Sequence, residues 1–215
     1  MEPIREQRAL LAIKEKMEEI PGHLGFYYKN LVTGYEYGVR ADEAFLAASV
    51  IKFPLFLHIL SESVKGNKSM EERLTVVEAD KVPSCGALTL FTGSVEADVR
   101  TLCRLMIAIS DNTATNKLIR HCTIERANEG FRAMGLVSTR LQRLLFDSKA
   151  SAAGIQNYIC PKEMGVLLEK LYRKEFVNPE VCKEAMDTLL LQQVDHKLNG
   201  KLCGVVCRFV NDIGR

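Results

Sequence analysis

The stretch AASVIKFPL contains the serine and the lysine whose types and spacing suggest chemistry. Ser49 and Lys52 are three positions apart at the head of an apolar run. Residues three apart share one face of a helix, so the Lys52 side chain can lie beside the Ser49 hydroxyl. A serine hydroxyl needs a base to take its proton before it attacks a carbonyl. Lysine can be that base only if burial lowers its pKa from about 10.4, and the apolar neighbours favour such burial.

Two interpretations of this pair stay open when it is considered alone: a nucleophile with its base, or an N-cap serine with a lysine that extends to solvent. A second motif favours the first. Ser110, Asp111 and Asn112 follow 61 residues later (110 − 49), between two segments with helical spacing. The Ser110 hydroxyl could relay a proton, and the Asn112 amide could hold a substrate amide or the lysine. All three residue types also cap helices, so a plain capping turn is the alternative.

The composition indicates a soluble globular protein with a sizeable core. The 215 residues are 47% hydrophobic and 26% charged, and the formal net charge is +2. Lysine and arginine are spread along the chain, so no nucleic-acid partner is indicated. No apolar run is long enough for a membrane span, and the N-terminal segment lacks the apolar core of a signal peptide. We therefore expect a cytoplasmic protein whose seven cysteines are free thiols.

The histidines and cysteines indicate neither a metal site nor a catalytic triad. Cys203 and Cys207 are the closest pair of thiols, with His196 nearby. A zinc site there is the alternative to small buried hydrophobic side chains, which we favour. His58 stands in an apolar run, which is typical of a packed core histidine. The sequence therefore predicts no metal and no organic cofactor.

The elements that must position these residues are many helices and few strands. An amphipathic helix is expected in the first 22 residues, and aromatic and β-branched residues predict a hairpin after it. This order predicts the α+β fold class: an antiparallel sheet of the N-terminal hairpin plus one C-terminal strand, flanked by helices, with an all-helical lobe and an incomplete sheet. The predicted strands are 23–31, 35–41 and one after 200. One helix is predicted to begin near 49, and further helices are predicted over 99–109, 112–122, 125–135, 161–175 and 179–198. Residues 74–92 and 138–160 are predicted to be irregular.

The two motifs, in this order, resemble the class A β-lactamases and penicillin-binding serine enzymes, whose signature is SxxK, SDN and KTG. The chain is similar to the broad β-lactamase enzyme family of serine hydrolases over nearly its whole length. The resemblance implies a β-lactamase/transpeptidase-like fold in one catalytic domain, 1–215, with an α/β lobe (about 1–55 and 160–215) and a helical lobe (about 56–159).

The resemblance also implies roles for the motif residues. Ser49 corresponds to the acylated nucleophile, and Lys52 to the general base or proton relay. Ser110 corresponds to the proton-shuttling serine, and Asn112 to a substrate-binding amide. Asp111 corresponds to a structural turn residue.

Two departures from the family pattern bear on activity. Leu144 and Leu145 stand where class A members carry the glutamate that activates the deacylating water, and Asp147 is the nearby carboxylate that could replace it. The KTG motif is missing: Lys197 and Gly200 in HKLNG have the wrong spacing, and FVNDIG resembles the segment that follows KTG. We therefore expect a truncated or degenerate member of the family.

Three functions follow from these motifs. The leading hypothesis is a weak serine hydrolase that cleaves a small-molecule amide, lactam or peptide through acyl-Ser49. The first alternative is penicillin-binding or DD-peptidase-like acylation without turnover, which the missing glutamate favours. The second is an inactive remnant or a binding protein, which the missing KTG favours. Cys85 could flank the pocket entrance, and Asn157 could face the site or serve only its turn.

Overall fold

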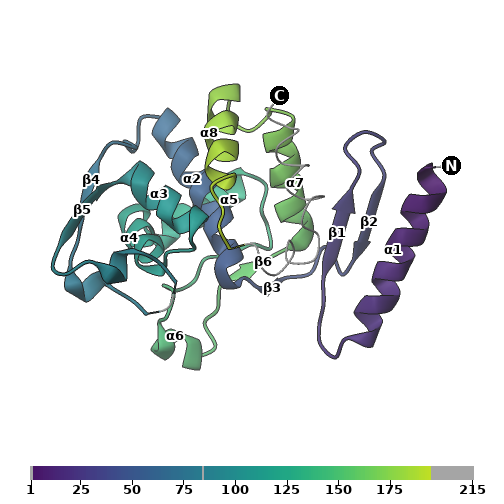
Figure 1. Cartoon of the computed structure of the whole chain (residues 1–215), viewed down its shortest axis with the longest axis horizontal. Helices are drawn as coiled ribbons and strands as arrows, with labels where there is room; N and C mark the ends of the chain where they lie inside the picture. The colour runs from purple at the N-terminus through teal and green to yellow at the C-terminus, as the bar shows by residue number, and fades with distance from the viewer. Residues whose placement is uncertain (1, 84, 195–215) are drawn as a thin grey trace.

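The computed structural model describes residues 2–83 and 85–194, where helices outnumber strands (Figure 1). In chain order the helices and strands are α1 (Glu2–Glu19), β1 (Phe26–Lys29), β2 (Glu36–Val39), β3 (Phe45–Leu46), α2 (Lys52–Val64), β4 (Arg73–Val76), β5 (Val95–Asp98), α3 (Val99–Ala108), α4 (Asn112–Cys122), α5 (Ile124–Ala133), α6 (Ser148–Ala152), β6 (Tyr158–Ile159), α7 (Pro161–Tyr172) and α8 (Pro179–Leu189). The strands form three antiparallel pairs, β1–β2, β3–β6 and β4–β5. The α+β class predicted from the sequence is confirmed.

The predicted N-terminal hairpin is present as β1 and β2. Its turn is closed by Asn30, whose Oδ1 accepts the backbone N–H groups of Val32 and Thr33 at 3.0 and 3.1 Å. Helix α1 lies along the hairpin at one end of the molecule (Figure 1), and Glu6 on α1 accepts the Tyr28 hydroxyl of β1 at 2.6 Å. Within the described residues no third strand joins this hairpin. The C-terminal strand predicted after residue 200 lies outside them.

Helix α2 is the centre of the hydrophobic core. It is apolar on most sides, as FPLFLHIL predicts, and it packs against α3, α4, α5 and α8. Leu55 and Leu57 are fully buried, and Phe56 is 1% exposed. Because the neighbouring helices enclose α2, the residues at its N-terminal end are held on a rigid support.

Residues 74–92, predicted to be irregular, begin with a strand that the sequence analysis missed. Strand β4 pairs with β5 in antiparallel register from Arg73↔Asp98 to Val76↔Val95. Each strand has only four residues, and residues 77–94 separate them. A connection of this length is not a tight turn between adjacent strands, so the pairing leaves no hairpin signature in the sequence.

Two further boundaries differ from the prediction. Residues 138–160, predicted to be a loop, contain the short α6 and also β6, which pairs with β3. The helix predicted over 179–198 ends at Leu189, because the chain then turns and the Gln193 N–H bonds to the Ala108 carbonyl at 2.8 Å. Residues 195–198 lie outside the described residues.

Candidate active site

A single 3₁₀ turn, Ala48–Ile51, brings Ser49 and Lys52 together at the start of α2. Side chains three positions apart eclipse one another in a 3₁₀ turn, which places the Lys52 side chain next to that of Ser49. The Lys52 Nζ donates to the Ser49 Oγ at 3.3 Å. Ser49 is exposed, whereas Lys52 is only 2% exposed. Ala48 has a left-handed backbone, φ +43°, a strained conformation of the kind that concentrates at functional sites.

Asp111 holds the turn between α3 and α4 in place. Its side chain accepts the N–H of Ala114 at 2.9 Å and thereby caps α4. It also accepts the N–H groups of Ala87 and Leu88, at 2.7 and 3.0 Å, from the preceding loop. Gly86 lies directly against this carboxylate, since a Cβ there would come within 2.3 Å of the Asp111 Cγ. The buried Asp111 therefore joins two loops, in keeping with a structural turn residue.

The two motifs meet at the Lys52 ammonium. Its Nζ donates to the Ser110 carbonyl at 2.7 Å, to the Ser110 Oγ at 2.8 Å and to the Asn112 Oδ1 at 2.8 Å. The Ser110 hydroxyl donates in turn to the Ser49 Oγ at 3.0 Å. Ser110 also has a left-handed backbone, φ +58°. The four predicted side chains thus form one network, and their catalytic roles stay predictions.

Burial changes the protonation of Lys52. Removal from water lowers the pKa of Lys52 to about 8, and the nearby Cys85 and Asp111 offset part of that effect. A lysine with this pKa is partly neutral near physiological pH, and the neutral amine can accept a proton. The site therefore meets the electrostatic condition for a lysine base.

Ser49 opens into a cavity with an empty volume of about 1190 Å³, which includes space open to solvent. Cys85, predicted near the entrance, lines this cavity, and its carbonyl accepts the Asn112 N–H at 3.1 Å. The other described lining residues come from the segment around Ser49, from the start of α4 and from the loop that leads to α6 and β6: Leu46, Ala47, Ala48, Asn112, Arg143, Leu145, Phe146, Asp147, Ser148, Ser151, Gln156 and Asn157.

Asn116 anchors that loop and was missed by the sequence analysis. It is 1% exposed, and its amide accepts the Leu145 N–H at 2.8 Å and donates to the Leu145 carbonyl at 2.9 Å. The signal that could have revealed it is spacing, because Asn116 lies four residues, about one helical turn, after Asn112 on α4.

Asn157 secures the same loop from its other end. Its side chain accepts the N–H groups of Gln142 and Arg143 at 2.7 and 3.0 Å. These contacts fit the turn role predicted for Asn157, and Asn157 also lines the cavity, as the alternative interpretation expects.

Leu144 and Leu145, at the position of the expected glutamate, lie in apolar surroundings in the structure. Leu145 lines the cavity, and Leu144 and Leu145 pack against the core. Asp147 lines the cavity too, but its Oδ1 accepts the Ala150 N–H at 2.9 Å and caps α6. Among the described lining residues Asp147 is the only carboxylate. Its proposed role as a base therefore competes with a capping role.

The part of the chain that the structure describes contains no cluster of three or more histidine, cysteine, aspartate or glutamate side chains able to hold a metal ion. Cys203, Cys207 and His196 lie outside that part, as do Lys197 and Gly200. No described helix is both long and apolar enough to cross a lipid bilayer.

Comparison with known proteins gives consistent matches. Residues 8–214 match the family model described as the beta-lactamase enzyme family. A beta-lactamase of Rhodobacter capsulatus is 31% identical over 166 residues, which cover 76% of this chain and 56% of the relative. Beta-lactamase L2 of Stenotrophomonas maltophilia is 27% identical over 173 residues, covering 80% and 57%. The chain thus spans a little over half the length of these curated relatives.

Solved structures agree with the sequence matches. The structure of PBP-A aligns with a TM-score of 0.77 at 27% identity, over 86% of this chain and 69% of that chain. A leucine-to-glutamate variant of PBP-A, solved as an acyl-enzyme complex with penicillin G, aligns with the same scores. Since the family model covers almost the whole sequence, this chain belongs to the β-lactamase enzyme family.

Proposed function

We propose that this chain is a serine hydrolase that opens a lactam or a related amide through an acyl-Ser49 intermediate and releases the acyl group slowly. The observation that carries the proposal is the buried Lys52 amine within hydrogen-bond reach of both the Ser49 and the Ser110 hydroxyls. A lysine in this environment can act as a base, and the serine beside it is exposed to the cavity.

Acylation begins when the neutral Lys52 amine removes the Ser49 proton, directly or through the Ser110 hydroxyl. The Ser49 Oγ then attacks the carbonyl carbon, and negative charge develops on the carbonyl oxygen. The Ser49 N–H lies in the first turn of a helix, where backbone N–H groups lack an intrahelical acceptor, so this group can stabilise that charge. As the C–N bond breaks, Ser110 passes the proton from Lys52 to the leaving nitrogen.

Deacylation requires a water molecule and a base to activate it, and the cavity supplies these poorly. Leu145 carries no group that can take a proton. We assign the residual deacylation to Asp147, which lines the same cavity. Because Asp147 also caps α6, this base is poorly placed for fast turnover. The PBP-A variant that holds penicillin G as an acyl-enzyme supports a lactam of that class as the ligand.

The second candidate function is acylation without turnover, as in penicillin-binding proteins. The apolar Leu145 at the cavity favours it. The two candidates share the acylation step and differ only in whether the ester is hydrolysed.

Intact-protein mass spectrometry with penicillin G tests the proposal. We expect one adduct per chain that persists for many minutes, no adduct in Ser49→Ala, and much slower formation in Lys52→Ala. Loss of the adduct with release of hydrolysed penicillin supports the slow hydrolase, and a permanent adduct supports the second candidate. Rapid hydrolysis without any adduct would overturn the missing-base argument, and an unlabelled wild-type chain that also leaves the lactam intact would overturn both candidates.

A further inference from the structure

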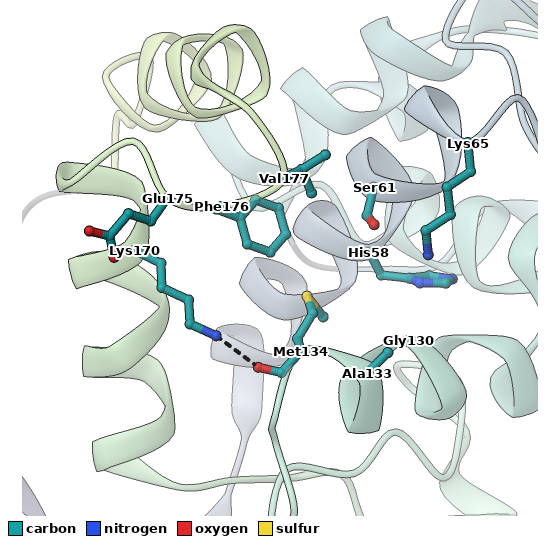
Figure 2. A pocket seen from close by; sticks show the side chains of 10 residues that line it. All are labelled: His58, Ser61, Lys65, Gly130, Ala133, Met134, Lys170, Glu175, Phe176 and Val177. Carbon is teal, nitrogen blue, oxygen red and sulfur yellow. Dashed lines mark hydrogen bonds between the residues drawn. The ribbon is translucent and has the colours of Figure 1, made fainter.

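A second cavity, lined by none of the proposed active-site residues, lies between α2, α5 and the segment that joins α7 to α8 (Figure 2). Its empty volume is about 690 Å³. His58 and Ser61 come from α2, the helix that begins with Lys52, and line one end. Figure 2 shows Lys170 of α7 at the opposite end, with Phe176 and Met134 between them.

The polar groups at the α2 end have no partners. His58 is 4% exposed, yet no group in the described ranges hydrogen-bonds its ring or the Ser61 hydroxyl. Burial lowers the pKa of His58, so the ring is neutral near pH 7 and can both donate and accept a hydrogen bond. Gly130 on α5 allows the ring to approach, because a Cβ there would meet the His58 Nδ1 at 2.0 Å. The ring nitrogens of His58 and the Ser61 hydroxyl are therefore open to a ligand or to water in the cavity.

The opposite end carries the Lys170 ammonium, and the Glu175 carboxylate also lines the cavity there. The Lys170 Nζ donates to the Met134 carbonyl at 3.3 Å, and within the described chain it has no carboxylate in ion-pair range. Lys65, on the rim, is by contrast paired with Glu62 at 2.9 Å. In Figure 2 the Glu175 carboxylate points away from His58 and Ser61. The ammonium of Lys170 is thus free to bind an anion with its remaining N–H groups.

The middle of the cavity is apolar and its rim is strained. Phe176 is 5% exposed, and Met134 lies opposite it. Val177 has φ of +59°, which is a true outlier for a β-branched residue. Backbone strain of this kind concentrates at ligand sites.

We propose that this cavity binds a small monocarboxylate whose apolar body carries a hydroxyl group at the far end. The carboxylate pairs with Lys170, the apolar body packs between Phe176 and Met134, and the hydroxyl bonds to Ser61 and His58. This site goes beyond the proposed function and does not depend on it.

An NMR titration with 4-hydroxybenzoate tests this site, with the ring signals of His58 as the reporter. We expect saturable shifts of those signals and no comparable shifts of the other histidines. Uncharged 4-hydroxybenzamide should bind at least about tenfold more weakly, because it lacks the charge-assisted bond to Lys170. Benzoate should bind a few-fold more weakly than 4-hydroxybenzoate, and Ser61→Ala should reduce this difference.

Lys170→Met should weaken 4-hydroxybenzoate binding by about tenfold or more. The matched control is Lys162→Met, since Lys162 lies on the same helix, pairs with Asp42 at 3.1 Å and does not line the cavity. The affinity of Lys162→Met for 4-hydroxybenzoate should stay within about twofold of the wild-type affinity. Ser49→Ala should bind normally, which separates this site from the lactam site. The proposal would be overturned if 4-hydroxybenzoate caused no saturable shift of the His58 signals. It would also be overturned if 4-hydroxybenzamide or inorganic phosphate bound as tightly as 4-hydroxybenzoate, or if Lys162→Met weakened binding as much as Lys170→Met.

Discussion

The rate of Ser49 acylation should depend on pH through Lys52. Burial lowers the pKa of Lys52 from its ordinary value of 10.5 to about 8. Only the neutral amine accepts a proton, and with this pKa the neutral share rises from about 9% at pH 7 to about 91% at pH 9. We therefore expect the second-order rate of acylation to increase about tenfold between pH 7 and pH 9 and then to level off.

A solvent-exposed lysine would give a different curve. With a pKa of 10.5 the neutral share is about 0.03% at pH 7 and about 3% at pH 9, a rise of about 100-fold without a plateau. The pH at which the rate levels off therefore reports how far the surrounding helices and the Ser110–Asn112 turn remove Lys52 from water.

The assay follows the growth of the penicillin G adduct by intact mass in buffers between about pH 6.5 and 9.5, where lysine protonation changes. Parallel samples of Ser49→Ala correct for spontaneous lactam hydrolysis. Lys52→Ala should react much more slowly and show no inflection near pH 8. A wild-type rate that climbs about 100-fold without levelling, or an inflection that survives in Lys52→Ala, would refute the assignment of Lys52 as the base.

Four further variants test the parts of the site separately. Asp111→Ala should lower the free energy of unfolding by at least about 3 kcal/mol in denaturant melts, because three backbone N–H groups lose a charged acceptor; a loss below about 1 kcal/mol would contradict this role. Asn116→Ala should cost about 2 kcal/mol and expose residues 143–147 to limited proteolysis, because both bonds to Leu145 disappear; unchanged cleavage would count against the anchor. Asp147→Asn should lengthen the adduct lifetime about threefold or more, because asparagine keeps the cap but cannot take a proton; an unchanged lifetime would remove Asp147 from the mechanism. Leu145→Glu should shorten the lifetime, read in the same mass assay, by placing a carboxylate in the cavity; a lifetime equal to wild type would show that the loop cannot direct that carboxylate at the ester.

The sequence was most informative where function fixes spacing. Ser49 and Lys52 are three apart, and one helical turn is enough to bring them together. The contact between Lys52 and Asn112 spans 60 residues, and only the joint occurrence of two motifs predicted it. Helix α2 and the start of α7 could also be predicted from the sequence. An apolar run indicates a buried helix, and a proline marks the first helical position.

Features made by long-range contacts left no such signature. The two residues of β3 pair with β6 more than a hundred positions later, and a two-residue strand has no periodicity to detect. The anchoring role of Asn116 depends on where the loop around Leu145 lies in space. The end of α8 at Leu189 is accompanied by the bond from the Gln193 N–H to the carbonyl of Ala108, the last residue of α3, more than eighty positions earlier.

The position of the acyl group tests the central claim most directly. Trypsin should release residues 41–52 as one peptide, ADEAFLAASVIK, in which Ser49 is the only hydroxyl or thiol side chain. After incubation with penicillin G, peptide mapping should find the mass of the lactam on this peptide, and Ser49→Ala should abolish the modification. Lactam found instead on residues 82–100, which carry the cavity-lining Cys85, would contradict Ser49 as the nucleophile.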